Sequence, residues 1–240
     1  MDKPKDIPCQ QQSVHPGSEQ AMSPAPQYDN KAYYKGSEKL KNKVALITGG
    51  DSGIGRSVSV LFAREGANVA IVYLKNHQDA NETKKLVEQE GQKCVLLCGD
   101  VSDASFCREA VDRTMKEFGA SQLDILVNHA GVQYWQEDFT KLSHEQLEKT
   151  FRTNVFSFFY MTQYALEHMK DHSQCCIINT TSQTAYKGKA QMIDYASTNG
   201  AITSFTRSLS QNLASRGIRV NGVAPGPIWT PFIPSSMPPD

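Results

Sequence analysis

The chain has 240 residues, of which 39% are apolar, enough for one domain with a substantial core. Its formal net charge is +0 at pH 7, so it offers neither the basic field that attracts nucleic acid nor an acidic tail. The sequence has no run of about 18 apolar residues, which argues against a membrane span, and its start lacks the apolar core of a secretory signal.

Six cysteines stand at positions 9, 94, 98, 107, 175 and 176. Their spacing contains neither a CxxC pair nor a zinc pattern with histidine partners, so we predict no metal site. Cys94 and Cys98 flank an apolar run, and Cys175 opens another. Reduced, mostly buried thiols in a cytoplasmic protein therefore fit this sequence better than disulfides do.

The first 40 residues differ in composition from the rest of the chain. They hold five prolines, many Gln and Ser residues and few aliphatic side chains. Such a segment buries too little apolar surface to offset its loss of chain entropy, so residues 1–40 are predicted to form a flexible tail. The alternative is an arm laid across a neighbouring subunit through Tyr28, Tyr33 and Tyr34.

Residues 41–240 form one predicted domain of alternating strands and helices. Short apolar runs predict strands at 43–48, 68–74, 93–98, 123–128, 175–180 and 218–223. Helical spacing predicts helices around 57–65, 79–91, 103–119, 145–170 and 194–216. This alternation indicates an α/β fold with a parallel sheet that helices cover on both faces.

A glycine-rich turn follows the first strand. The segment TGGDSGIG (48–55) precedes a helix, and Gly49, Gly53 and Gly55 suit a tight turn where the backbone closely approaches a ligand. The helix then aims free N–H groups at a diphosphate. Inside a βαβ unit this pattern predicts a dinucleotide site, while the other reading is that the glycines serve only packing.

The choice between NAD(H) and NADP(H) depends on the end of the second strand. Proteins that bind NAD usually place a carboxylate there for the ribose 2′-OH, but this chain has Tyr73-Leu74-Lys75-Asn76. Lys75 can instead meet a 2′-phosphate, although the turn carries Ser52 where an arginine would strengthen that interpretation. We therefore favour NADP(H).

With these motifs in this order, the chain resembles the short-chain dehydrogenase/reductase family over residues 41–232. The segments TGGDSGIG and APGPIWTP are most similar to a bacterial general-stress branch of uncharacterised oxidoreductases. The resemblance implies a doubly wound Rossmann fold with six strands in the order 3-2-1-4-5-6. Together, the motif and the resemblance assign cofactor binding to Gly49, Ser52, Gly53, Ile54, Gly55, Lys75, Asp100, Val101, Asn128, Ala130, Gly131, Tyr195, Pro225, Gly226, Ile228 and Thr230.

The resemblance also implies catalytic roles for three residues. Ser182 matches the serine that polarises the substrate carbonyl, and Tyr195, 13 positions later, matches the general acid/base. Asn154 matches the asparagine that holds a water in the proton path. Hydride transfer to a carbonyl carbon requires a proton for the oxygen, which a phenol supplies while a serine hydroxyl holds the alkoxide.

Two positions depart from the family pattern. His129 replaces the second asparagine of Asn-Asn-Ala-Gly, and we interpret it as local repacking in preference to the alternative, a new catalytic base. Asn199 stands at the position of the family's catalytic lysine, which binds the nicotinamide ribose and lowers the tyrosine pKa. Because Asn199 can hydrogen-bond a ribose hydroxyl but carries no charge, we predict slower proton transfer. Lys187 or Lys189 could replace the lysine, although both fit solvated loop positions better.

The resemblance further implies that the family's C-terminal helix and seventh strand are absent from this chain. The helices near 145–170 and 194–216, which build one interface of the family, remain. We therefore expect a homo-oligomer, a dimer through these helices, with no nucleic-acid or membrane partner.

The sequence thus predicts an NAD(P)-dependent oxidoreductase that transfers a hydride between nicotinamide and a small carbonyl or alcohol substrate. Asn199 and the shorter C-terminus are expected to weaken it. The alternative is a catalytically inactive, nucleotide-binding remnant of such an enzyme. Ser182, Tyr195 and Asn154 favour the enzyme, whereas Asn199 and His129 favour the remnant.

Overall fold

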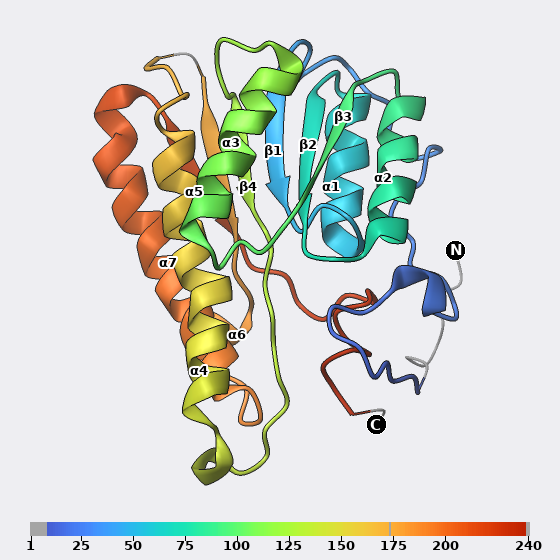
Figure 1. The fold of residues 1–240 in the computed structure, drawn as a ribbon, viewed down its shortest axis with the longest axis vertical. Helices are drawn as coiled ribbons and strands as arrows, with labels where there is room; N and C mark the ends of the chain where they lie inside the picture. The colour runs from blue at the N-terminus through green and yellow to red at the C-terminus, as the bar shows by residue number, and fades with distance from the viewer. Residues whose placement is uncertain (1–8, 173, 239–240) are drawn as a thin grey trace.

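The computed structural model describes residues 9–172 and 174–238 (Figure 1). Its centre is one parallel sheet with the strand order β3-β2-β1-β4-β5-β6, so the predicted order is confirmed. The strands are β1 Val44–Thr48, β2 Asn68–Tyr73, β3 Cys94–Cys98, β4 Ile125–Asn128, β5 Cys176–Thr180 and β6 Arg219–Val223. Residues 224–238 contain no helix or strand.

The central strand β1 is buried along its whole length. Successive side chains of a strand point to opposite faces, so Leu46 joins one apolar cluster while Ala45 and Ile47 join the other. Each fully buried Leu or Ile side chain contributes roughly 1.5–3 kcal/mol of burial free energy. Burial on both faces explains why the sequence of this strand is a continuous apolar run without alternation.

Helices cover both faces of the sheet. They are α1 Gly53–Arg64, α2 His77–Gln89, α3 Ala104–Phe118, α4 His144–Phe151, α5 Ser157–Ala165, α6 Thr184–Lys187 and α7 Ile193–Leu213. Helices α1 and α2 pack on the cluster that contains Ile47, whereas α3, α5 and α7 pack on the cluster that contains Leu46. This doubly wound arrangement brings the carboxyl ends of all strands to one edge of the sheet, at the lower end of the strands in Figure 1.

The structure divides the long helix that was predicted over 145–170. A π-helical segment, Arg152–Phe156, separates α4 from α5. The sequence contains no Gly or Pro over this range, so nothing in it indicated the widened turn. The short helix α6 also lies where we had expected only a loop.

The described part of the N-terminal segment, residues 9–40, packs against its own chain. Glu19, in the 3₁₀ helix Glu19–Ala21, and Met22 are both buried. Near the C-terminus of α1, the Arg64 guanidinium donates hydrogen bonds of 2.8 and 2.6 Å to Asp29. Residues 1–8 lie outside the described part of the chain, and a contact of this segment with a neighbouring subunit stays a prediction.

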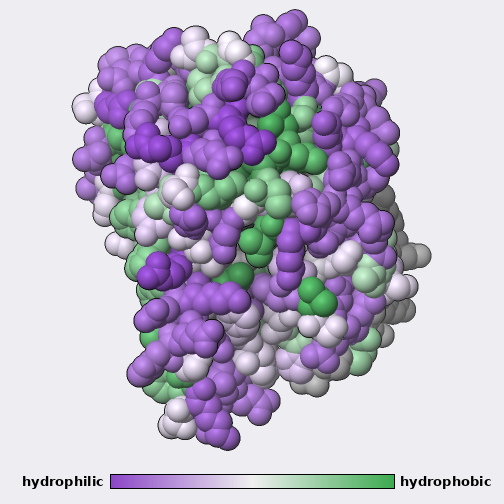
Figure 2. Space-filling model, viewed as in Figure 1, coloured by the Kyte–Doolittle hydropathy of each residue, from purple (hydrophilic) through white to green (hydrophobic). Residues whose placement is uncertain are grey.

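The surface in Figure 2 is mainly hydrophilic, with a narrow apolar band in the middle of the face shown. Across residues 9–172 and 174–238, no helix is long and apolar enough to cross a membrane. Four of the six cysteines are buried, and no disulfide joins any of the six. The described residues also contain no group of three or more His, Cys, Asp and Glu side chains arranged to hold a metal ion.

Candidate active site

The turn between β1 and α1 requires glycine for steric reasons. Gly49 has a φ of +68° and Gly53 a φ of +51°, in the left-handed region that glycine favours. A Cβ on Gly55 would lie only 1.9 Å from the carbonyl oxygen of Gly49. A Cβ on Gly53 would lie 2.9 Å from the side chain of Thr230. A side chain at any of these positions would therefore strain or displace the turn.

The N-terminus of α1 offers hydrogen-bond donors beside this turn. Ser52 is the N-cap residue, and its side chain makes no capping hydrogen bond. The N–H of Gly53 donates to the Glu19 carboxylate at 2.7 Å, whereas the N–H groups of Ile54 and Gly55 have no partner among the described residues. Because free N–H groups at the positive end of a helix bind anions, these residues fit the diphosphate of a dinucleotide cofactor.

The residues predicted to meet the adenosine half of the cofactor lie at neighbouring strand ends. Lys75 follows β2 and is exposed, and Asp100 follows β3 and is also exposed. The Asp100 carboxylate accepts the Ser102 N–H at 2.8 Å, while Val101 is buried. β2 lies between β1 and β3 in the sheet. The glycine turn after β1, Lys75 after β2 and Asp100 after β3 therefore lie side by side along the sheet edge.

Asn128 links the end of β4 to the rest of the sheet. It is fully buried, and its amide nitrogen donates to Asn179 on β5 at 3.0 Å. The next two backbone N–H groups, of His129 and Ala130, donate to the hydroxyl of Thr48 at 2.9 and 3.0 Å. These bonds hold the end of β4 against β1, beside the glycine turn.

His129 lies within hydrogen-bonding distance of a neighbouring strand. Its Nδ1 is 3.0 Å from the Thr180 hydroxyl at the end of β5. Desolvation by burial lowers the pKa of His129 to about 4, so the imidazole is neutral at pH 7. A neutral ring bonded to a threonine fits the interpretation of local repacking.

We expect His129 to make the protein less stable as the pH falls. In the unfolded chain the imidazole gains a proton near its ordinary pKa of 6.5, whereas in the folded chain it stays neutral to about pH 4. Its stabilising contribution is therefore complete above pH 6.5 and is lost as the pH falls towards 4. The free energy of unfolding should fall between pH 7 and pH 4.5 by about 1–2 kcal/mol less in His129→Asn than in the unsubstituted protein. Equal losses in both proteins would contradict this prediction.

Ser182 and Tyr195 come together at the same sheet edge. Ser182 follows β5 and is buried, and its Oγ accepts the Thr184 N–H at 3.2 Å. Tyr195 lies in the first turn of α7. Burial raises the pKa of Tyr195, and the neighbouring Ser182 and Asn199 side chains lower it by less. The Thr181 hydroxyl, next to Ser182, donates to the Asn199 carbonyl at 3.0 Å, so the fold holds the Ser182 segment against the helix that carries Tyr195.

Asn199 lies one helical turn after Tyr195 on α7 and is buried. Its Nδ2 donates to the backbone carbonyl of Tyr195 at 2.8 Å. The position that carries a lysine in the family pattern thus holds a neutral amide that is hydrogen-bonded to the helix backbone. It supplies no positive charge to the phenol.

Asn154 lies in the π-helical segment and is buried. Its Oδ1 accepts the Val132 N–H at 2.7 Å, and its Nδ2 donates to the Val132 carbonyl at 2.8 Å and to Thr198 at 3.2 Å. A Cβ on Gly131 would lie 3.4 Å from the same Oδ1. The side chain therefore joins the loop after β4 to α7, and its predicted role in holding a water stays a prediction.

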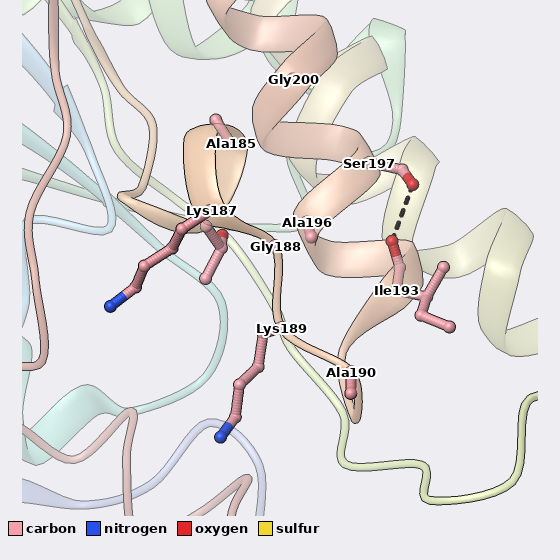
Figure 3. A pocket seen from close by; sticks show the side chains of 10 residues that line it. Ala185, Lys187, Gly188, Lys189, Ala190, Ile193, Ala196, Ser197 and Gly200 are labelled. Carbon is pink, nitrogen blue, oxygen red and sulfur yellow. Dashed lines mark hydrogen bonds between the residues drawn. The ribbon is translucent and has the colours of Figure 1, made fainter.

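Lys187 and Lys189 do not approach the position of the missing lysine. Both are exposed, and Figure 3 shows both side chains extending away from α7. The Lys189 Nζ lies 5.2 Å from the centre of the Trp135 ring. A hollow of about 580 Å³ opens beside them between α6 and the start of α7, and neither Ser182 nor Tyr195 lines it.

The loop after β6 passes between the serine and the glycine turn. The Pro225 carbonyl accepts the Gln183 N–H at 3.1 Å, and Gly226 lies against the same glutamine. Ile228 is half-exposed, whereas Thr230 is buried against Gly53. The predicted nicotinamide loop is thus held at both ends by other parts of the site.

Asp194 is a positioning residue that the sequence analysis did not identify. It is buried, and its Oδ2 accepts hydrogen bonds from Thr150 at 2.8 Å and Gln146 at 3.1 Å, both on α4. Its Oδ1 accepts the Tyr195 N–H at 2.8 Å. The sequence signal that could have identified Asp194 is an acidic residue in the first turn of a predicted helix. Asp194 fixes the start of α7, and therefore the backbone of Tyr195, on α4.

Comparison with known proteins assigns the family. The model of the short chain dehydrogenase family matches residues 43–238. The chain belongs to this family. General stress protein 39 of Bacillus subtilis (strain 168) is 56% identical over 235 residues, which cover 98% of this chain and 80% of that protein.

Two further relatives have names that mention a cofactor. NADPH-dependent aldehyde reductase 1, chloroplastic, of Arabidopsis thaliana is 47% identical over 234 residues, 95% of this chain and 80% of that protein. A crystal structure of a short chain dehydrogenase from Burkholderia cenocepacia J2315 in complex with NADP has a TM-score of 0.74 and 33% identity. That match covers 78% of this chain and 75% of the other. The predicted family is confirmed, while the roles of individual site residues stay predictions.

Proposed function

We propose that this short-chain dehydrogenase transfers a hydride between NAD(P) and a small carbonyl or alcohol substrate. The observation that carries this proposal is the Ser182–Tyr195 pair at the sheet edge that also holds the glycine turn. The Thr181 hydroxyl, next to Ser182, donates to the Asn199 carbonyl at 3.0 Å, and Asn199 lies one helical turn from Tyr195, which supports a shared role of the Ser182 and Tyr195 hydroxyl groups at one carbonyl oxygen.

Different residues of this chain are assigned to different parts of the reaction. When bound, the nicotinamide supplies or accepts the hydride. During reduction Tyr195 gives a proton to the developing alkoxide, and Ser182 donates a hydrogen bond to the same oxygen. The N–H groups of Ile54 and Gly55 would hold the diphosphate. The loop residues that would hold the nicotinamide amide are Pro225, Gly226, Ile228 and Thr230.

We propose NADP(H) as the preferred cofactor. Lys75 is exposed directly after β2, next to the turn that would hold the diphosphate. No carboxylate lies among residues 73–76 to bind a ribose 2′-OH. The names of the Arabidopsis thaliana relative and of the Burkholderia cenocepacia complex agree with this preference.

We also propose that the enzyme catalyses this reaction slowly. Asn199 brings no charge, and neither Lys187 nor Lys189 extends towards α7. Burial raises the pKa of Tyr195, which makes its deprotonation harder during alcohol oxidation. The second candidate function, nucleotide binding without catalysis, is favoured by this uncharged Asn199.

One pair of measurements separates the two functions. Fluorescence titration with NADPH and NADH measures cofactor binding, and a panel of aldehydes and ketones measures turnover. Binding of NADPH more tightly than NADH, with slow turnover of at least one carbonyl compound, is the expected result. Binding without any turnover would favour the nucleotide-binding alternative. Failure to bind either cofactor would contradict both functions.

We also propose a homo-oligomer through α5 and α7, which Figure 1 shows next to each other. Phe156, which directly precedes α5, and Phe159 on α5 are 41% and 50% exposed. The Phe159 ring centre lies 4.4 Å from that of Phe205 on α7, so aromatic side chains bridge the two helices. An apolar face of this kind is suited to a second copy of the same chain related by a two-fold axis.

Phe159→Glu is therefore expected to convert the oligomer into a monomer, because it places a charge in the proposed apolar interface. Light scattering with size-exclusion chromatography would measure the mass. Phe139→Glu is the matched control, because Phe139 is also exposed but lies in the 3₁₀ helix Phe139–Lys141, outside α5 and α7. A monomeric unsubstituted protein, or an unchanged mass in Phe159→Glu, would contradict the proposed interface.

A further inference from the structure

Glu19 connects the N-terminal segment to the proposed cofactor site. It is 5% exposed, although it lies in a segment whose composition predicted a flexible tail. Its Oε2 accepts the Gly53 N–H at 2.7 Å, and its Oε1 accepts a hydrogen bond from the buried guanidinium of Arg56. Glu19 therefore occupies the first donor of α1, directly before the free N–H groups of Ile54 and Gly55.

Arg56 extends this contact to the glycine turn and to α2. Its Nη2 donates to the backbone carbonyls of Asp51 at 3.1 Å and Asp79 at 3.2 Å, and its Nε donates to Thr83 at 2.8 Å. Arg56 is 4% exposed, so its charge needs a buried partner. The buried Asp79 carboxylate, 3.7 Å from the guanidinium, is a second ion-pair partner, so without Glu19 the guanidinium would lose one of two buried acidic partners, and the glycine turn would be held less firmly.

The N-terminal segment also reaches the other two parts of the proposed cofactor site. The Asn76 amide, next to the end of β2, donates to the Gly17 carbonyl at 2.8 Å. The Trp229 indole, in the loop after β6, donates to the Pro24 carbonyl at 2.8 Å. Figure 1 shows the segment beside the last described residues, below the carboxyl ends of the strands. Residues 17–24 thus bridge the glycine turn, the end of β2 and the proposed nicotinamide loop.

We propose that Glu19 is a positioning residue for the dinucleotide, and that residues 17–24 form an outer wall of the cofactor site. Glu19 fixes Gly53 and Arg56, so that the N–H groups of Ile54 and Gly55 face the diphosphate. This inference rests on the proposed function. It makes the N-terminal segment a component of the active site.

Glu19→Gln tests the role of the carboxylate, because it keeps the side-chain shape and removes the charge. We expect the dissociation constants of NADPH and NADH both to rise about 10-fold, since the diphosphate is common to the two cofactors. Titrations are made well below the unfolding temperature of each variant. Asp29→Asn is the matched control, because it removes another ion pair of the N-terminal segment, at the opposite end of α1. Its cofactor affinity should stay within about twofold, as expected for a distant, independent site.

Each outcome has a distinct meaning. If the unsubstituted chain binds no dinucleotide, the proposed function itself is wrong. If it binds dinucleotide and Glu19→Gln binds equally well, only the role of Glu19 is wrong. Tighter binding by Glu19→Gln would show that the carboxylate competes with the diphosphate, which overturns the inference. An equal loss of affinity in Asp29→Asn would show that general loosening of the N-terminal segment weakens cofactor binding. That result would also overturn the inference.

A second measurement needs no variant and covers the case in which Glu19→Gln fails to fold. Amide hydrogen exchange of the unsubstituted chain is followed with and without NADPH. If residues 17–24 form a wall of the cofactor site, their exchange should slow when NADPH binds. Exchange in residues 17–24 that does not respond, while exchange in the glycine turn slows, would overturn the inference.

Discussion

Asn199→Lys is expected to increase carbonyl turnover by about 10²–10⁴-fold, the factor that general acid–base catalysis typically contributes. Residue 199 lies one turn from Tyr195 on α7, and the amide of Asn199 donates to the Tyr195 backbone carbonyl at 2.8 Å. An ammonium group about 4 Å from the phenol, at an effective dielectric of ~20, contributes roughly 4 kcal/mol or about three pKa units. That is an upper figure for a site that water can enter.

The pH profile of alcohol oxidation gives an independent check of the same change. Oxidation requires the phenolate of Tyr195, and burial raises its pKa above the ordinary value of 10.0. The rate of the unsubstituted protein should therefore still rise with pH at pH 10. In Asn199→Lys the added positive charge favours the phenolate, so the plateau should move to lower pH by up to about three units.

Asn199→Gln is the matched control, because it changes the length of the side chain without adding a charge. It should leave the pH profile in place, with cofactor binding measured in parallel by fluorescence. If Asn199→Lys binds the cofactor normally and gains no activity, the missing charge does not limit catalysis. The predicted effect of the lysine would then be wrong, or another feature of the site would limit the rate.

Gly55→Ala is expected to weaken cofactor binding by about 100-fold or more, which corresponds to at least roughly 2.7 kcal/mol. The new Cβ would lie 1.9 Å from the carbonyl oxygen of Gly49, a backbone atom that cannot move aside alone. The turn must open, which displaces the N–H groups of Ile54 and Gly55. Overpacking of this kind also costs about 1–3 kcal/mol of folding stability. Titration with NADPH and thermal unfolding measure the two effects separately.

Gly200→Ala provides the control for a glycine in a helix without steric constraint. Apart from its chain neighbours and the backbone of α7 itself, no described atom lies within 4 Å of a Cβ built on Gly200. The substitution should leave cofactor affinity unchanged and stabilise the helix by about 0.5–1 kcal/mol, because alanine loses less backbone entropy than glycine. Normal NADPH binding by a folded Gly55→Ala protein would show that the diphosphate does not bind at this turn.

The sequence by itself determined the architecture and the position of the glycine turn in it. β1 is apolar at nearly every position because both faces of a parallel strand are buried, and this is a local pattern. The order of short strands and helices then allowed few sheet topologies, because crossover connections between parallel strands are right-handed. The resemblance to the family pointed to Ser182 and Tyr195, and the end of a parallel strand and the start of the following helix lie at the same sheet edge.

The tertiary structure decided the contacts between segments that are far apart along the chain. The burial of Glu19 against Gly53 and Arg56 joins positions 34 and 37 residues apart, and the proline-rich composition around it predicted a flexible tail. The direction in which Lys187 and Lys189 extend depends on how α6 and its loop pack beside α7. Likewise, the widened turn at Asn154 has no local sequence signal. Composition and periodicity report which face of an element is buried, whereas the partner that buries a polar group is set only when the chain is folded.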